Sequence, residues 1–379
     1  MWNNKALPTP LMQLQLMLLK QLTLAHAAHA ASAHAGTGGL HHLAQPAGLD
    51  AEFLCESGRL LRRSETTKGW PAGCPYVLVN QTFNWPSAAM PRVAVPSQLD
   101  STGAATAAHT LKYVSLCEQF IAHAFASVWA RVCPAEPTAK HRTVFVDSGA
   151  NEGTWSLLAA AYGCHSLAVE PQSTCIGWIK DAAQHNRIAD SVETRLAFLG
   201  RRREPARIEQ GACSVRFQGK QHGGQSAQHS SLVPTMPLSA MLQPSDIVPL
   251  WHIDVEGAEV GVLLSSRDLL VARRVQRVMV ELTPENWRSF GHDEADAFPK
   301  LAALFGGWHC VVACSGRPFL WTDRPKGPCR DSWRLCRQAK GCRANRRSSG
   351  GCLQAAHDVY CVAPEQAHDD PGLKVLTGH

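Results

Sequence analysis

The middle of the chain alternates short apolar segments with amphipathic ones, and this alternation constrains the fold more than any other feature. Apolar segments bounded by turn residues predict strands at 143–146, 167–169, 192–199, 250–255 and 277–282. Segments of helical periodicity lie between them at 154–162, 173–188 and 259–271. Strands that alternate with helices form a parallel sheet covered on both faces, so the sequence predicts an α/β fold.

The segments on either side of this core are less regular. A helix is predicted at 111–132 before the first strand, and a helix at 293–305 follows the last one. Two closing strands are predicted at 309–313 and 358–362. The predicted organisation is therefore an irregular N-terminal region at 36–110, rich in turn-forming clusters, and a main domain at 111–379 with a Cys/Arg-rich insertion at 315–357.

The first 35 residues have the composition of a targeting segment. No acidic residue precedes Asp50, a leucine-rich run covers 11–19, and small-x-small steps follow at 28–30 and 33–35. The run is too short to span a bilayer, so no transmembrane segment is predicted. We interpret residues 1–35 as a secretory signal, with an organelle transit peptide or a disordered tail as the alternatives. Fourteen Cys favour the secretory lumen or the extracellular space over an organelle.

Half of the Cys residues lie between Cys310 and Cys361. No C-x-x-C pair occurs in the chain, so the usual zinc spacing is missing and no metal site is predicted. In an oxidising compartment these Cys favour disulfides that staple the insertion. Seven is an odd number, so at least one of them must pair outside the group or stay free.

The net charge of +6 is concentrated in the insertion. Residues 317–347 carry ten Lys or Arg against Asp323 and Asp331, and they include Trp321 and Trp333. Basic side chains interleaved with aromatic ones are typical of surfaces that bind a polyanion, and an acidic polysaccharide suits a luminal protein better than nucleic acid does. The alternative is a solvated loop without a partner.

The segment VFVDSGANEGTW, residues 144–155, joins a strand to a helix through a glycine-rich turn. Glycines there let the backbone turn tightly and let a ligand approach the helix N-terminus. A dinucleotide fingerprint needs G-x-G-x-x-G, but Asn151 occupies its middle position, so a ligand without phosphates such as S-adenosylmethionine fits better. Glu170 ends the next strand and is placed to accept hydrogen bonds from two ribose hydroxyls. The alternative is a tight turn beside a surface glutamate.

The segment LWHIDVEGAEV, residues 250–260, holds three ionisable side chains at a strand end. Alternation along an extended strand places His252, Asp254 and Glu256 on one side, at the edge where open α/β sheets bind ligands. Glu259 falls in the first turn of the following helix, where a carboxylate favours the dipole. The alternatives are a satisfied core histidine and two helix-start carboxylates.

The ordered set VDSGANEGTWSLLAA, VEP, PLSAML, HIDVEGAE and VMVEL resembles the FkbM family of S-adenosylmethionine-dependent methyltransferases over residues 144–286. The resemblance implies a class I methyltransferase (Rossmann-like) fold, with seven mostly parallel strands of which the last is antiparallel. It implies O-methylation of hydroxyls on sugars or other small acceptors. Asp254 and Glu256 would face the transfer site. The resemblance assigns cofactor binding to Asp147, Gly149, Asn151, Gly153, Glu170, Ala197 and Phe198.

Methyl transfer to an alcohol needs a base within hydrogen-bond reach of the hydroxyl, because an alcohol is barely ionised at neutral pH. Asp254, Glu256 and His252 are the candidates: Asp254 to orient the methionyl amine or the acceptor, and Glu256 or His252 to take the proton. Two other functions compete with this one. The domain would be a degenerate methyltransferase fold that binds a polyanion through its basic insertion, or it would methylate protein or nucleic acid.

Overall fold

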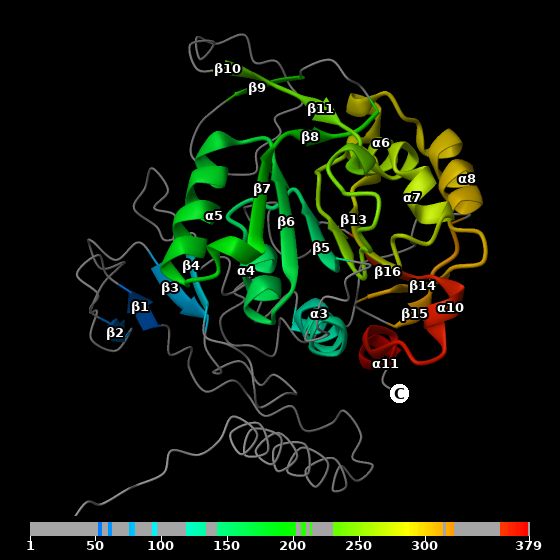
Figure 1. Cartoon of the computed structure of the whole chain (residues 1–379). Helices are drawn as coiled ribbons and strands as arrows, with labels where there is room; N and C mark the ends of the chain where they lie inside the picture. The colour runs from blue at the N-terminus through cyan, green and yellow to red at the C-terminus, as the bar shows by residue number, and fades with distance from the viewer. Residues whose placement is uncertain are drawn as a thin grey trace, which may run out of the picture. The chain divides into compact units, whose positions relative to one another are not determined.

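An eight-stranded sheet carries the strands predicted for the middle and the end of the chain, in the order β15-β14-β16-β13-β12-β5-β6-β7 (Figure 1). The parallel half consists of β5 (Val144–Ser148), β6 (His165–Glu170), β7 (Val192–Leu196), β12 (Trp251–Ile253) and β13 (Arg277–Leu282). Beyond β13, β16 (His357–Val362) runs antiparallel to both β13 and β14 (His309–Val312). The antiparallel last strand is therefore confirmed, and β15 (Arg317–Pro318) adds a short eighth strand at the edge.

The computed structural model describes residues 119–133, 142–201, 230–313, 316–321 and 357–377, together with Cys213 and the backbone of five short strands. Those strands are β1 (Glu52–Leu54), β2 (Leu60–Arg62), β3 (Tyr76–Val79), β4 (Val93–Pro96) and β9 (Ala206–Glu209). The predicted signal at 1–35 and most of the Cys/Arg-rich insertion lie outside the described residues.

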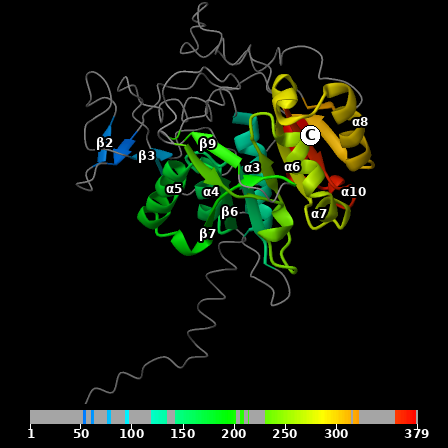
Figure 2. The same cartoon turned by 90° about the horizontal axis from the view of Figure 1, so that it is seen from above.

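Helices pack against both faces of the sheet. Figures 1 and 2 show α4 (Thr154–Ala161) and α5 (Ser173–His185) beside β6 and β7. Next to β13, α6 (Glu259–Ser265) contacts the strand, and α7 (Arg267–Val271) and α8 (Glu294–Leu304) pack with α6 (Figure 1). One apolar cluster joins Phe145 and Met279 to α3 (Gln119–Val132), α4 and α11 (Pro371–Thr377). A second joins Val146 and Trp251 to α6, α7 and α8. Burial on both faces explains why the centres of these strands, such as 144–146, 167–169 and 278–280, are apolar.

The region predicted to be irregular at 36–110 contains a four-stranded antiparallel sheet in the order β2-β1-β3-β4. The prediction of an irregular region was wrong there because strands of three or four residues are too short to display a period in the sequence. The last of them, β4, contacts α4 and α5.

Two predicted elements of the main domain are divided. The helix expected at 259–271 ends at Ser265 and resumes at Arg267. The strand expected at 192–199 ends at Leu196, after which β8 (Phe198–Leu199) pairs with β11 (Thr235–Met236) instead of with the large sheet. This second division matters for function because the chain leaves the sheet beside Glu170, whose carbonyl oxygen accepts a hydrogen bond from the Ala197 amide at 3.3 Å.

The first residues of the predicted insertion belong to the core. Trp321 is 5% exposed, stacks on Phe305 with ring centroids 4.7 Å apart, and points its indole N–H at the Cys310 sulfur. This position contradicts the prediction that Trp321 is part of a polyanion-binding surface, because a buried ring is not available to a glycan. The prediction was wrong because Trp321 stands beside basic residues in the sequence and was therefore taken for a surface residue. The segment 316–321 is too short for a hydrophobic period to indicate its burial.

Three disulfides occur among the described residues: Cys133–Cys164, Cys175–Cys213 and Cys310–Cys361. Cys310 and Cys361 face each other on β14 and β16, so two of the seven C-terminal Cys pair with each other. Disulfides persist in oxidising compartments, and these three are consistent with one. Among the described helices, none combines the length and the apolar character needed to cross a membrane.

Candidate cofactor and transfer site

The turn after β5 is built from backbone conformations that side chains rarely adopt. Gly149, Asn151 and Gly153 have φ values of 77°, 50° and 82°. The amides of Gly149 and Ala150 donate to the Val169 carbonyl of the neighbouring strand, at 2.9 and 3.2 Å. This turn is therefore fixed against the end of β6, and its left-handed residues mark it as a strained site of the kind that functional turns often contain.

The same turn touches the second motif directly. A Cβ atom placed on Gly149 would lie 1.7 Å from the carbonyl oxygen of Asp254. The Asp254 amide in turn donates to the Ser148 carbonyl at 2.9 Å. The two segments that the sequence analysis singled out thus form one backbone contact at the carboxyl edge of the sheet, between residues 105 positions apart in the sequence, and only glycine allows it.

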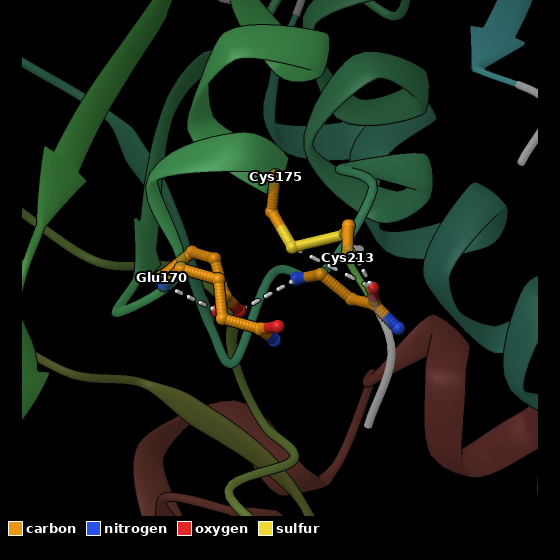
Figure 3. Close-up of a disulfide and its surroundings, with 5 residues drawn as sticks. Glu170, Cys175 and Cys213 are labelled. Atoms are coloured by element: carbon orange, nitrogen blue, oxygen red, sulfur yellow. Dashed lines mark hydrogen bonds between the residues drawn. A yellow bond between two sulfur atoms is a disulfide. The ribbon is translucent and has the colours of Figure 1, made fainter. Parts of the chain in front are cut away.

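Glu170 lies at the end of β6 with its carboxylate held by two backbone amides. Asn151 donates to Oε2 at 3.0 Å and Gln172 donates to Oε1 at 2.9 Å (Figure 3). Burial raises the pKa of this carboxyl group, while the two amide hydrogen bonds oppose the shift. Because the residue is 3% exposed, the alternative of a surface glutamate is wrong.

Asp147 is a buried support of the turn. One carboxylate oxygen accepts hydrogen bonds from the Ser156 amide at 3.1 Å and the Ser156 hydroxyl at 2.7 Å. The other oxygen lies 2.9 Å from His252 Nδ1. Ser156 stands in the first turn of α4, so Asp147 caps this helix from the strand below it. Asp147 would therefore act on a ligand indirectly, because it fixes the start of α4.

The start of α4 offers polar groups to a ligand. Gly153 is the N-cap residue of the helix, and it has no side chain that could bond the free amides of the first turn. The Thr154 hydroxyl is buried and has no hydrogen-bond partner among the residues that the structure describes. A buried hydroxyl without a partner is costly unless something else bonds it, so this one fits a polar ligand group at the helix N-terminus.

The second turn holds Asp254, Glu256 and Gly257 after β12. The extended strand ends at Ile253, and Glu256 has a φ of 51°, so simple alternation does not carry His252, Asp254 and Glu256 to one side. Gly257, with a φ of 115°, packs against η6 (Pro284–Phe290), where a Cβ would lie 2.6 Å from the Asn286 Cβ. Burial, together with the negative charge of Glu285, raises the pKa of Glu256.

Glu259 ties this turn to η6 from below. Its Oε1 accepts hydrogen bonds from the Gly257 amide at 2.6 Å and the Thr283 hydroxyl at 3.0 Å, and its Oε2 accepts from the Trp287 indole at 2.7 Å. The side chain is fully buried, which raises its pKa against the effect of these donors. Glu259 is thus more than the helix-start carboxylate that the sequence indicated: it fixes the position of the turn.

His252 lies within the aromatic core. Its ring contacts Phe125 and Trp155, with centroids 5.6 and 6.1 Å away, and is 7% exposed. With Nδ1 next to Asp147, it has the surroundings of a satisfied core histidine, which the sequence analysis kept as its alternative.

The comparison with known families agrees with this geometry. Residues 147–306 match a family model described as Methyltransferase FkbM domain. The part of the chain from residue 147 to residue 306 is an FkbM methyltransferase domain. The strand order, with a parallel core and an antiparallel β16, gives this domain the class I methyltransferase fold. Both turns and all residues named in them so far lie inside the matched range.

Solved structures with similarity to the chain are remote. A crystal structure of WbdD, described as a bifunctional kinase-methyltransferase, is 12% identical with a TM-score of 0.35 over 67% of this chain. The chain covers 42% of WbdD. The N-terminal domain of human METTL16 is 14% identical with a TM-score of 0.30, over 57% of this chain and 81% of that one. No curated protein sequence matches the chain.

Some residues of the FkbM domain site were missed by the sequence analysis. Thr154, Gln172 and Cys213 carry no signal in the sequence, because each depends on a contact that only the fold creates. The role of Glu259 was partly visible in the sequence, because a glutamate two residues after a glycine can accept a hydrogen bond from the glycine amide, as Glu259 does from Gly257. Ala197 follows β7 and donates its amide to the Glu170 carbonyl, and Phe198 donates its amide to the Pro234 carbonyl; their assignment to the cofactor stays a prediction.

Proposed function

We propose that the chain is an S-adenosylmethionine-dependent O-methyltransferase that acts on a hydroxyl group of a glycan or a small molecule. The observation that carries this proposal is the backbone contact between Gly149 and Asp254. It joins the turn next to Glu170 to the turn that holds Glu256. A group suited to ribose and a group suited to proton removal thus flank one edge of the sheet, which is where open α/β sheets bind ligands.

The residues in and around the first turn fit the cofactor. Glu170 would accept hydrogen bonds from the two ribose hydroxyls, since both of its oxygens are oriented by backbone amides. The buried hydroxyl of Thr154, at the start of α4, would bond the carboxylate of the methionine part. Ala197 and Phe198 would line the adenine beside Glu170. When bound, S-adenosylmethionine supplies a methyl group activated by a sulfonium.

The residues of the second turn would serve the acceptor. Glu256 is our candidate for the general base, because burial and the charge of Glu285 raise its pKa toward the range in which a carboxylate takes a proton effectively. Asp254, in the same turn, would orient the acceptor hydroxyl. His252 is the weaker candidate because its ring is enclosed by Phe125 and Trp155. Holding the hydroxyl in line with the methyl group is the main requirement of the reaction.

Replacing Glu170 should weaken cofactor binding. We expect Glu170→Ala to raise the Kd for S-adenosylmethionine by about tenfold or more, which corresponds to about 1.4 kcal/mol per factor of ten, as measured by titration calorimetry. Glu193→Ala is the matched control, since Glu193 lies on the neighbouring strand β7 and pairs with Arg142 and Arg195. Folded wild-type protein that does not bind the cofactor would refute the proposed function.

The acceptor is tested directly. Purified protein is incubated with methyl-labelled S-adenosylmethionine and a panel of mono- and oligosaccharides, small alcohols, amines, unfolded protein and RNA. We expect label in a hydroxyl-bearing sugar or small molecule, and loss of that label in Glu256→Gln. Label that appears only in protein or RNA would replace the proposed acceptor class and leave the methyltransferase assignment intact.

The pH dependence of the reaction should reveal the base. Glu285→Gln removes the negative charge that helps to raise the pKa of Glu256. The base must be deprotonated to act, so we expect the acidic limb of the kcat/KM profile to move to lower pH in this variant. Asp293→Asn is the control, because Asp293 is an exposed acid that pairs with Arg288. An unchanged acidic limb in Glu285→Gln would remove Glu256 as the titrating base.

We also propose that the protein works in the secretory lumen or outside the cell. The three disulfides of the described residues support this location, as do the leucine-rich run and the small-x-small steps near the N-terminus. Determining the N-terminal residue of the protein purified from its source would test it, since removal of the first 35 residues or so is expected for a signal peptide.

A further inference from the structure

The Cys175–Cys213 disulfide lies next to the candidate cofactor turn. Cys175 is in the first turn of α5, three residues after Gln172, and both sulfur-bearing side chains are fully buried. Figure 3 shows the disulfide near Glu170, with dashed lines for the two amide hydrogen bonds that the Glu170 carboxylate accepts. The disulfide thus holds Cys213, 38 positions after Cys175 in the sequence, close to the carboxyl edge of the sheet.

The disulfide contacts the side chain of Asn151. Its Cys213 sulfur lies 3.0 Å from Asn151 Oδ1, and its Cys175 sulfur lies 4.0 Å from the same oxygen. Disulfide sulfurs carry no proton, so this is a close packing contact and not a donated hydrogen bond. Asn151 needs such support, because its φ of 50° is a left-handed conformation that costs about 1–3 kcal/mol and persists only where the surrounding structure holds it.

The same residue holds Glu170. The Asn151 amide donates to Glu170 Oε2 at 3.0 Å, so the direction of this N–H depends on the left-handed backbone that the disulfide packs against. The contacts form a continuous series from the two sulfurs to the Asn151 side chain, then to its amide, and finally to the carboxylate. Movement of Asn151 would leave one oxygen of a buried carboxylate without its donor.

The other two disulfides do not touch this series. Cys164 precedes β6, at the opposite end of the strand from Glu170, and joins it to the end of α3. Cys310 and Cys361 join β14 to β16, on the other side of the sheet order from β6. Each of these closes a loop of similar size, with sequence separations of 31 and 51 residues against 38 for Cys175–Cys213.

We propose that the Cys175–Cys213 disulfide is a positioning element of the cofactor site, which holds Asn151 and through it the Glu170 carboxylate in the geometry that binds the ribose. This inference rests on the proposed function. It implies that cofactor affinity depends on the redox state of this pair: a dithiol reductant that converts the disulfide into two thiols, and is itself oxidised to a disulfide, weakens binding.

Three double variants separate positioning from stability. Each replaces one cysteine pair by alanines, and each should lower Tm, because losing a disulfide that closes such a loop costs about 2–5 kcal/mol. Only Cys175→Ala/Cys213→Ala should also raise the Kd for S-adenosylmethionine, by about five- to tenfold in calorimetry. The Cys133/Cys164 and Cys310/Cys361 variants should bind as the wild type does.

A fourth variant tests whether the disulfide acts through Asn151, and it does not depend on whether the cysteine variants fold. Asn151→Gly keeps the left-handed backbone and the amide but removes the oxygen that the sulfurs contact. We expect it to raise the Kd about as much as loss of the disulfide does, and the combined variant to be no worse than either, because both act on one series of contacts.

The outcomes distinguish the inference from the function on which it rests. Wild-type protein without cofactor affinity overturns the proposed function. Wild-type affinity in Asn151→Gly, or equal loss of affinity in all three cysteine variants, overturns the positioning role while the function stands.

Discussion

Gly149→Ala is expected to abolish cofactor binding and methyl transfer together. The new Cβ would lie 1.7 Å from the Asp254 carbonyl oxygen, a backbone atom that cannot rotate away, and the residue would have to keep a φ of 77°. Either the first turn moves away from the second or the chain abandons the left-handed conformation. In both cases the two turns separate, so we expect no measurable heat of binding with S-adenosylmethionine and a loss of transfer of at least about a hundredfold, about 2.7 kcal/mol.

Gly163→Ala provides the matched control. Gly163 has a comparable φ of 92°, but a Cβ there would approach nothing closer than the Cys133 carbonyl oxygen at 3.8 Å, at the far end of α4 from the turn. We expect this variant to lower the free energy of unfolding by about 1–2 kcal/mol through backbone strain alone and to bind the cofactor normally. Equal loss of binding in both variants would show that the effect of Gly149→Ala is global and not due to the contact between the turns.

The order of the helices and strands was predictable from the sequence, but the exact boundaries of several of them were not. Burial on both faces makes the centres of β5, β6 and β13 apolar, at 144–146, 167–169 and 278–280, so these strands were predictable from hydrophobicity alone. The turn at Gly149 was predictable because its glycines are spaced for left-handed backbone. The break at Ser266 and the departure of the chain after Leu196 were not, because each is decided by packing against the neighbouring elements and by no local residue preference.

The same distinction applies to the site. Glu170 was identifiable because it is the polar end of an apolar strand, whereas the hydrogen bonds that the Asn151 and Gln172 amides donate to it became visible only with the fold. Periodicity suggested that His252 and Glu256 share a side, but it holds only while the strand is extended, and the strand ends at Ile253. Asp147 and Glu259 support the site from below, but the sequence indicated a cofactor-binding residue for the first and a helix-start carboxylate for the second, since charge is visible in a sequence and burial is not.

Glu259 is the buried group whose removal should have the largest effect on the second turn. Its carboxylate accepts from the Gly257 amide, the Thr283 hydroxyl and the Trp287 indole, and all three donors lose their partner in Glu259→Ala. A buried donor without a partner costs about 1–3 kcal/mol, so we expect a loss of at least about 3 kcal/mol in the free energy of unfolding, measured by urea denaturation. We also expect kcat to fall more than cofactor affinity, because the turn that holds Glu256 loses its support while Glu170 keeps both donors.

Two further variants define how Glu259 acts. Thr283→Val removes one donor together with its need for a partner, so it should cost only about 1 kcal/mol and keep most of the activity.

Glu259→Gln tests the charge of the buried carboxylate. Because burial raises the pKa of Glu259, the folded protein binds this proton more tightly than the unfolded chain, and stability falls as pH rises through the raised pKa. The uncharged amide cannot titrate, so the decline of stability with rising pH should be shallower in Glu259→Gln; an identical slope would mean that the three donors keep Glu259 ionised at all these pH values, and that its burial is fully offset.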